Sequence, residues 1–353
     1  MSLRFYLLKR SLIAVVLFIA VLVFNFFIFR LPVFIMGMDP INLYVSREME
    51  PSARERLREV YGIPRVDAGI EEWINHFLLY MRNMIFLDFG DSFTSFAPVV
   101  DDIMERLPNT LLLMGSSTLL SIIIGIIIGI VAASRHGGKF DTAMITLGLS
   151  LYSFPVFWIG MMLILFLSFY LDLFPLGHSV SNSETYQGGL AFWVNLERGI
   201  INGETIAGLL RYLQDLLWHL VLPCLTLTIA FYGGYMLLMR NTLVEVLTED
   251  YILTARAKGL HERTVLFRHG LRNAFLPLIT VIAINFAFIV SGAVLTETVF
   301  AWFGMGRLLF EALISYDWPV CQAIFFLIAI CVIAANIIAD ILYGVLDPRI
   351  KYG

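Results

Sequence analysis

The residue types that perform catalysis do not form a recognisable set in this chain of 353 residues. The run from Gly137 to Lys139 lacks both the earlier glycine and the following Ser or Thr of a GxxxxGK[ST] phosphate-binding loop. No HExxH helix or nucleophile elbow occurs, and the neighbouring carboxylates Asp101 and Asp102 are typical of a solvated loop. We therefore expect no catalytic residue and no phosphate-binding loop in this chain.

Metal ligands and nucleic-acid contacts are not indicated either. The three cysteines lie in apolar runs without the spacing of metal ligands, which favours small packing residues: Cys224, Cys321 and Cys331. The formal net charge is -4, and no basic block could follow a phosphate backbone. We expect no metal, no cofactor and no nucleic-acid partner.

A few polar side chains stand in otherwise apolar stretches, where they are costly and are candidates for function: His219, Asn285, Ser291, Asn336 and Asp340. Most of them are expected to form hydrogen bonds between helices. Asp340 lies close to the end of its apolar stretch, where it can reach the membrane surface or pair with a basic residue.

The most strongly patterned polar segment is 240–275. Thr248, Glu249 and Asp250 can cap and begin a short helix through Ala255 and Lys258, and the following glycine can end it. Three basic residues come after it: Arg263, Arg268 and Arg272. The pattern favours a docking surface, and the alternative is an amphipathic helix on the membrane surface.

The elements that position these residues are membrane-spanning helices. The chain is 59% hydrophobic and 15% charged, whereas about 25% of the residues in a soluble domain are charged. Six uncharged runs meet or nearly meet the ~20 residues that cross a bilayer. They are 11–29, 110–133, 142–171, 216–239, 273–296 and 319–339. The sequence predicts an all-helical integral membrane protein with six transmembrane helices.

The basic residues predict the orientation of those helices. Of the 24 Lys and Arg residues, 13 fall in the segments 1–10, 134–141, 240–275 and 346–353. Cytoplasmic loops carry this excess, so both termini are expected in the cytoplasm. The long segments 30–108 and 172–215 then lie outside, and a short helix is expected over 50–61. The segment 300–314 suits a re-entrant or interfacial helix.

Small residues and prolines indicate how the spans pack. Five small residues at four-residue intervals line one face of the second span: Ser117, Ser121, Gly125, Gly129 and Ala133. Another helix can approach this face closely. Kinks are expected at Pro155, Pro223 and Pro277.

Separated motifs resemble one known family. The segment 240–275 contains TARAKG at 254–259, which is followed by RHGLRNAFLP at 268–277. Further motifs are MDP at 38–40, DFGDS at 88–92, ERLPNT at 105–110, ETVFAWFGMG at 297–306 and YGVLDPRIKYG at 343–353. Together they resemble the permease subunits of ATP-binding-cassette importers, in the dipeptide, oligopeptide and nickel branch. Leu253, Thr254 and Ala255 stand where the general importer motif has Glu-Ala-Ala, and Phe303 replaces an expected proline.

The resemblance implies a type I importer permease fold with three parts: an N-terminal tail and first helix over 1–30, an extracytoplasmic region over 31–108, and a core over 109–353 with the coupling loop 240–275. It implies that five residues contact the ATPase: Thr254, Ala255, Lys258, Gly259 and Leu260. The candidate pore or gate residues are Asn285, Ser291, Glu297 and Phe303.

The implied partners are a second homologous permease, two ATPase subunits that bind ATP and Mg, an extracellular solute-binding protein and the lipid bilayer. The implied cargo is a di- or oligopeptide, with nickel or oligosaccharides as alternatives. An ion-coupled secondary transporter is the competing class, but the spans show neither a chain of carboxylates nor an inverted repeat.

Overall fold

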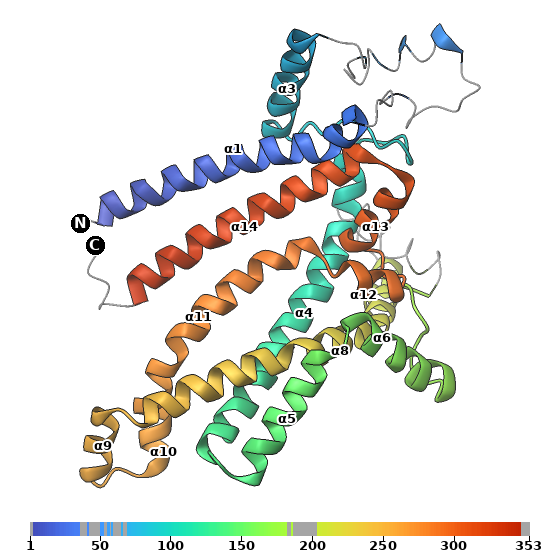
Figure 1. Cartoon of the computed structure of the whole chain (residues 1–353). Coiled ribbons are helices and arrows are strands. Elements are labelled where there is room, and N and C mark those ends of the chain that lie inside the picture. The colour runs from blue at the N-terminus through green and yellow to red at the C-terminus, as the bar shows by residue number, and fades with distance from the viewer. Residues whose placement is uncertain are drawn as a thin grey trace. The chain divides into compact units, whose positions relative to one another are not determined.

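The computed structural model describes residues 3–35, 69–181 and 203–346, together with residues 41, 50–52, 55, 56, 58, 65 and 185. Every regular element within these residues is a helix (Figure 1). Half of the residues of the helix expected over 50–61 fall outside the described residues, as do the side chain of Asp340 and the last residues of the chain.

Five described helices are long and apolar enough to cross a membrane, and a bent pair makes up to six spans. The long single helices are α1 (Leu3–Ile35), α4 (Val99–Ser134), α8 (Gly203–Leu247) and α14 (Trp318–Leu346). The fifth span runs from α10 (Glu262–Thr264) through η3 (Val265–Gly270) and α11 (Leu271–Ala287) to η4 (Phe288–Ser291). The all-helical fold expected from the sequence is confirmed.

The third predicted span is broken rather than straight. It consists of α5 (Lys139–Ser153), α6 (Val156–Leu163) and η2 (Ile164–Tyr170), with a bend of 96° between α5 and α6. Pro155 forces the preceding Phe154 out of the helical region, to a ψ of 142°. The proline therefore redirects the chain and does not merely kink it.

The fifth span also ends earlier than the sequence predicted. It stops at Ser291 rather than at Thr296, because Gly292 has a φ of +70° that a helix cannot contain. A separate short helix, α12 (Val294–Val299), follows. The helix expected within 300–314 is α13 (Met305–Ser315), preceded by a non-helical turn.

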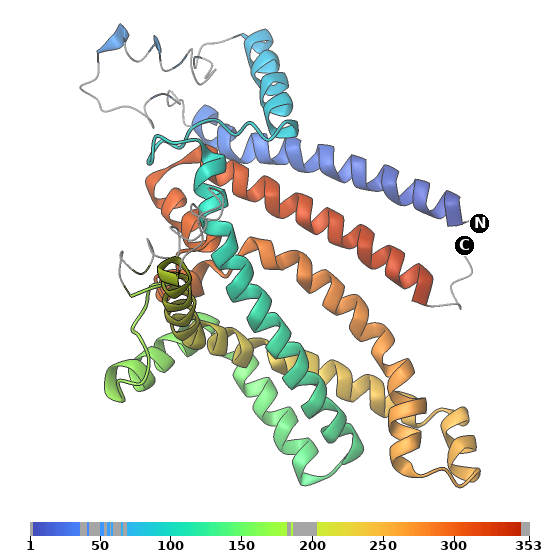
Figure 2. The same cartoon turned by 180° about the vertical axis from the view of Figure 1, so that it is seen from behind.

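The chain divides into two compact units. Unit 1 comprises Met1–Pro108, Leu308–Ile341 and Pro348–Gly353, and unit 2 comprises Asn109–Arg307 and Leu342–Asp347. In unit 1, α1 and α14 run side by side (Figures 1 and 2). Asn25 donates from Nδ2 to the carbonyl of Gln322 at 3.1 Å, and Phe29 packs on Trp318 with 5.6 Å between ring centroids.

A loop before α4 is fixed to the start of α14 within unit 1. The Ser92 hydroxyl donates to Asp317 Oδ2 at 2.6 Å, and the Thr94 N–H donates to the same oxygen at 3.1 Å. Arg106 pairs with Glu311 of α13 at 2.8 Å. These contacts involve the DFGDS and ERLPNT motifs, so those segments hold unit 1 together.

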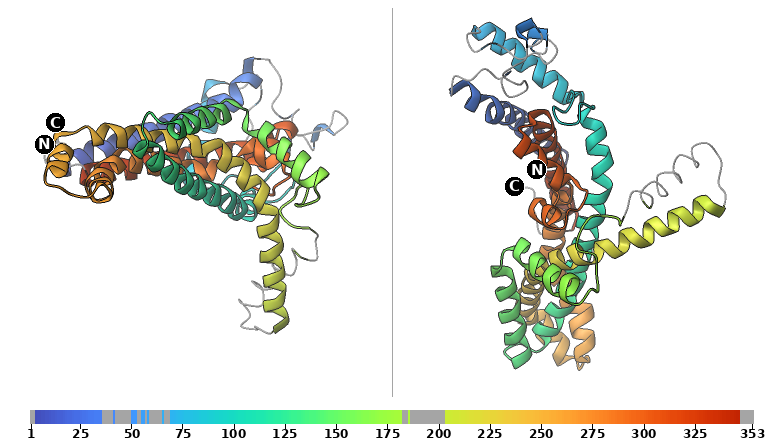
Figure 3. Two further views of the ribbon diagram at one scale, coloured as in Figure 1. Left: turned by 90° about the horizontal axis from the view of Figure 1, so that it is seen from below. Right: turned by 90° about the vertical axis from the view of Figure 1, so that its right-hand side faces the viewer.

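Unit 2 is organised around α8, on which α5, α6 and α11 pack (Figure 3). The small-residue face of α4 meets α8 as well, which confirms the close approach predicted from the sequence. A Cβ added at Gly125 would lie 2.7 Å from the Tyr232 carbonyl oxygen, and one added at Gly129 would lie 2.7 Å from that of Met236. The backbones of the two helices therefore nearly touch.

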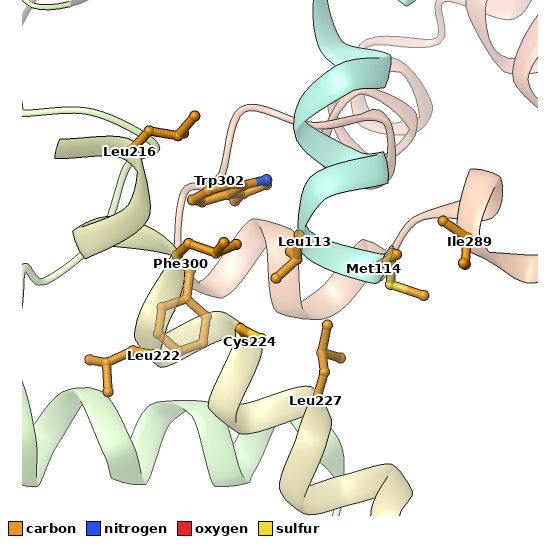
Figure 4. Packing of buried hydrophobic residues seen from close by; sticks show 10 residues of the cluster. Leu113, Met114, Leu216, Leu222, Cys224, Leu227, Ile289, Phe300 and Trp302 are labelled. Atoms are coloured by element: carbon orange, nitrogen blue, oxygen red, sulfur yellow. The ribbon is translucent and has the colours of Figure 1, made fainter. Parts of the chain in front are cut away.

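An apolar core of unit 2 involves the ETVFAWFGMG motif. Figure 4 shows Phe300 and Trp302 among residues of α4 and α8. Leu113, Leu222 and Leu227 belong to this cluster and are at most 2% exposed. The aromatic residues of the motif thus anchor the turn that follows α12.

Candidate coupling loop and outer turn

The predicted helix of the loop 240–275 is present as α9 (Asp250–Ala257). Glu249 begins it in an extended conformation, and Lys258 is its C-cap. Gly259 has a φ of +74° and its N–H donates to the Arg256 carbonyl at 2.9 Å. Because the left-handed region suits glycine, this residue reverses the chain at low conformational cost.

The helix α9 is held against the rest of its own loop by a small apolar cluster. Ile252 and Val265 are fully buried in it, and Ala255 is 6% exposed. Arg256 and Glu262 close the loop with a side-chain hydrogen bond of 2.9 Å. Asn273 of α11 donates to the Tyr251 hydroxyl at 2.7 Å. The position of α9 is therefore set by the start of the fifth span.

The five candidate coupling residues do not share one surface. Thr254, Lys258, Gly259 and Leu260 are exposed, whereas Ala255 faces the cluster inside the loop. The free side of α9, which faces away from this cluster, also includes Leu253, which is 53% exposed. Exposed leucines on a polar loop are a surface that a partner can cover.

A buried ion pair joins the end of α8 to the turn between α4 and α5. Arg240 donates from Nε to Asp141 Oδ1 at 3.0 Å and from Nη2 to Oδ2 at 2.7 Å. Asp141 is 2% exposed, and its Oδ2 also accepts the Gly137 N–H at 2.9 Å. His136 Nδ1 lies 2.7 Å from Arg240 Nη2. Two cytoplasm-facing segments of the predicted topology are thereby tied together.

Glu297 is fully buried and receives hydrogen bonds from three elements. Its Oε1 accepts from the Thr110 hydroxyl at 3.1 Å and from the Ala293 N–H at 3.2 Å. Its Oε2 accepts from the Arg307 N–H at 3.1 Å. Burial raises the pKa of the Glu297 carboxyl above its ordinary value, and these donors oppose the rise.

The chain closes tightly around this carboxylate. A Cβ added at Gly304 would lie 2.5 Å from Glu297 Oε2 and 2.5 Å from Thr110 Oγ1, and one added at Gly292 would lie 2.7 Å from Glu297 Oε1. The Thr110 hydroxyl also accepts the Met305 N–H at 2.7 Å. We call Glu297, Thr110 and the turn 300–307 the carboxylate knot.

The other gate candidates differ in their surroundings. Asn285 donates to the Tyr235 hydroxyl at 2.8 Å, which links α11 to α8. The hydroxyl of Ser291 donates to the Phe288 carbonyl within its own helix at 2.6 Å. Asn109 donates from Nδ2 to the Phe303 carbonyl at 2.7 Å, next to the carboxylate knot.

Three important residues were not singled out from the sequence: Thr110, Asp141 and Arg240. Thr110 ends the ERLPNT motif and Arg240 begins the loop 240–275, so both stood beside recognised patterns. Asp141 is one acidic residue in a turn, and nothing local marks it as buried. Within the described part of the chain, no group of three or more His, Cys, Asp or Glu residues could hold a metal ion.

Comparison with known proteins shows the family of this chain. Residues 125–352 match the family described as binding-protein-dependent transport system inner membrane component. The chain is 34% identical to the oligopeptide transport system permease protein AppB of Bacillus subtilis, over 98% of this chain and 99% of that protein. It is 33% identical to the dipeptide transport system permease protein DppB of Escherichia coli K12, over 98% of both chains. It is 32% identical to the glutathione transport system permease protein GsiC of Escherichia coli, over 98% of this chain and 99% of that protein.

Proposed function

Because the chain belongs to the family of binding-protein-dependent transport system inner membrane components, we propose that it forms half of the pore of a peptide importer. The observation that supports this proposal is the similarity along 98% of the chain to permeases named for oligopeptides and dipeptides. The third relative is named for glutathione, a short peptide as well. The protein is a multi-pass membrane subunit without catalytic activity of its own.

The proposed assembly supplies what this chain does not contain. A second homologous permease completes the pore, two ATPase subunits bind ATP and Mg, and an external binding protein delivers the peptide. Both termini and the loop 240–275 face the cytoplasm in this arrangement. The excess of Lys and Arg in those segments supports this orientation.

We place ATPase coupling on the free side of α9 and the reversal that follows it. Thr254, Lys258, Gly259 and Leu260 are exposed there, and Leu253 extends the apolar part of the surface. Ala255 contributes from inside, because its small side chain lets α9 lie close to Val265. Movement of the ATPase would then be transmitted to α8 and α11, which carry the ends of the loop.

We assign a positioning role to the gate candidate Glu297. Its carboxylate is fully buried and accepts hydrogen bonds from Thr110 and Arg307, so protein encloses it on the side where a peptide would pass. It fixes the turn 300–307 against α4, where Phe303 is partly exposed. If the outer side of the pore opens or closes, the turn 300–307 must either move together with α4 as one rigid body or lose the hydrogen bonds of the carboxylate knot.

Peptides are favoured over the alternative cargoes. The relatives cited above are named for peptides, whereas nickel and oligosaccharides were implied only by the wider branch. The test is uptake of a labelled dipeptide and a labelled oligopeptide by proteoliposomes with the complete transporter. Competition by unlabelled peptides supports the proposal, and competition only by nickel or by an oligosaccharide contradicts it.

The coupling surface is tested with Leu260→Glu and Gly259→Trp in the assembled transporter. We expect peptide uptake to fall at least tenfold in both, while the chain still inserts and assembles with its partner permease. The matched control is Ile252→Val, which removes one buried methylene within α9 and costs about 1 kcal/mol without altering the free surface. Normal uptake by both variants, with normal assembly, would place the coupling element elsewhere.

A further inference from the structure

The helix α3 (Ile70–Ile85) carries an apolar arc that is wider than the surface packed against it. At 100° per residue, one half of the arc holds Phe77, Tyr80 and Met84, and the other half holds Ile74 and Leu78. Tyr80 and Met84 are 4% exposed, but Ile74 is 52% and Leu78 is 57% exposed. Ile70 and Ile85 continue the exposed half, at 81% and 52%.

The remaining face of α3 is polar. Glu71, Glu72 and Arg82 are exposed on it, together with Leu79. At 100° per residue, Glu72 lies about 160° from Ile74, whereas Glu71 and Arg82 border the apolar arc. A helix with one charged face and a wide apolar arc either packs on protein or lies in a membrane surface. Among the described residues of unit 1, contacts bury only half of this arc.

The covered half shows where α3 lies along the first span. Phe26 of α1 packs on Phe77 at 5.0 Å and on Tyr80 at 5.3 Å between ring centroids. Phe26 is three residues before Phe29, the end of the apolar span Arg10–Phe29. At 1.5 Å per residue it lies ~4.5 Å below that end, at the edge of the hydrocarbon region.

The direction of α3 suits the same location. Figures 1 and 2 show α3 crossing the axis of α1 steeply near the outer end of that span. A helix that crosses a spanning helix steeply runs along the membrane plane. Its Trp73 and Tyr80 are the aromatic types enriched at membrane surfaces.

At the level where α3 packs, α1 also exposes large apolar side chains. Phe24 is 68%, Phe27 is 48% and Ile28 is 50% exposed, within two residues of Phe26, and at 100° per residue they lie on faces of α1 turned away from α3. These side chains belong to a membrane span, so acyl chains surround them. Because α3 packs on Phe26, its uncovered side chains lie at the same level along α1 as these residues.

We propose that α3 is an interfacial helix that lies in the membrane surface at the C-terminal end of α1. Ile70, Ile74, Leu78 and Ile85 enter the acyl chains, and the two glutamates and Arg82 face water. The helix fixes the segment before α4 at the level of the bilayer. The inference needs only the spanning role of α1 and is independent of the cargo.

The test is spin-label accessibility in the full chain, assembled in its transporter in nanodiscs of phosphatidylethanolamine and phosphatidylglycerol. A nitroxide is attached at Leu78→Cys or, as the matched control on the polar face, at Glu72→Cys. The native Cys224, Cys321 and Cys331 are replaced by alanine. Collision rates with oxygen, which concentrates in lipid, and with a neutral nickel chelate, which stays in water, are compared.

We expect oxygen to dominate at position 78 and the nickel chelate to dominate at position 72. Dominance of the nickel chelate at both positions would show that α3 stands in water and would overturn the proposal. Low collision rates with both reagents at position 78 would also overturn it, because they would show that a partner protein covers the arc.

Discussion

At the residue scale, the least expected arrangement is the burial of a carboxylate beside the turn 300–307. Glu297 is 0% exposed, yet each described partner offers it a donor: the Thr110 hydroxyl and the N–H groups of Ala293 and Arg307. A buried carboxylate is tolerated only when its oxygens are satisfied in this way. The glycines beside it leave room for backbone to approach where side chains would block it.

We therefore predict that Thr110→Val destabilises the protein. The change leaves the Met305 N–H without its acceptor and removes one donor from Glu297, which costs about 1–3 kcal/mol. The matched control is Thr226→Val on α8, where the lost bond at 2.8 Å is to a carbonyl of the same helix. Thermal unfolding in detergent measures both, and equal melting temperatures for the two variants would contradict a structural role for the knot.

At the element scale, the close contact between α4 and α8 depends on glycines and other small residues on α4. Ser117 and Ser121 are fully buried on the same face as the two glycines that almost touch α8. Lipid tails are as apolar as leucine, so helix association in a membrane gains from close backbone packing. A larger residue on this face must push the helices apart.

The helix pair offers a comparison within α4. Gly125→Ala places a Cβ 2.7 Å from both the Tyr232 carbonyl oxygen and the Tyr235 Cβ, whereas Gly115→Ala meets nothing within 4 Å. We expect the first variant to lose about 1–3 kcal/mol through overpacking. The second should keep its stability or gain up to about 1 kcal/mol from better helix propensity. Melting temperatures measured in detergent test this difference. An equal loss of stability in both variants would contradict the close approach of α4 and α8.

The ion pair between Asp141 and Arg240 also joins two elements, because it links the start of α5 to α8, the helix that leads into the coupling loop. Removing one partner leaves a charge in a site where Asp141 is 2% exposed. Arg240→Gln or Asp141→Asn should each cost about 3–5 kcal/mol.

The double variant should cost clearly less than the two single changes together, because neither charge is then stranded. Unfolding in detergent measures this coupling, and strict additivity would show that the two side chains do not depend on each other. In the assembled transporter, we also expect either single change to reduce peptide uptake per ATP hydrolysed.

At the scale of the whole molecule, the distribution of charge predicts the orientation of the spans. Cytoplasmic loops retain Lys and Arg, and the loop 240–275 contains six of them, from Arg240 to Arg272. The segment 30–108 then lies on the other side. Orientation is a property of the whole chain, because one reversed span would reverse every loop that follows.

Cysteine labelling in intact cells checks this topology. A membrane-impermeant maleimide should label Ser95→Cys and leave Glu262→Cys unlabelled until the membrane is opened. Both positions are exposed, so accessibility within the protein does not limit the reaction. The parent chain measures the background of the native cysteines. Labelling of the second variant in intact cells would reverse the predicted orientation.

The sequence alone determined the features that depend on local pattern. Length and apolarity of a run are enough to identify a span, because the bilayer demands about 20 apolar residues wherever the span lies. The helix α9 and its glycine reversal were predictable from cap residues and from the conformational freedom of Gly259. The motifs along the chain likewise identified the family before any contact was known.

Only the tertiary structure decided which distant residues meet. Thr110 and Glu297 are 187 positions apart, and Asp141 and Arg240 are 99 apart, so no local period relates them. It also turned Ala255 inward and set the bend at Pro155 to 96°. The physical reason is that burial and hydrogen bonding depend on how helices pack. Packing depends on the shapes of several helices at once. The residue pattern of one helix indicates only which of its faces is apolar enough to be covered.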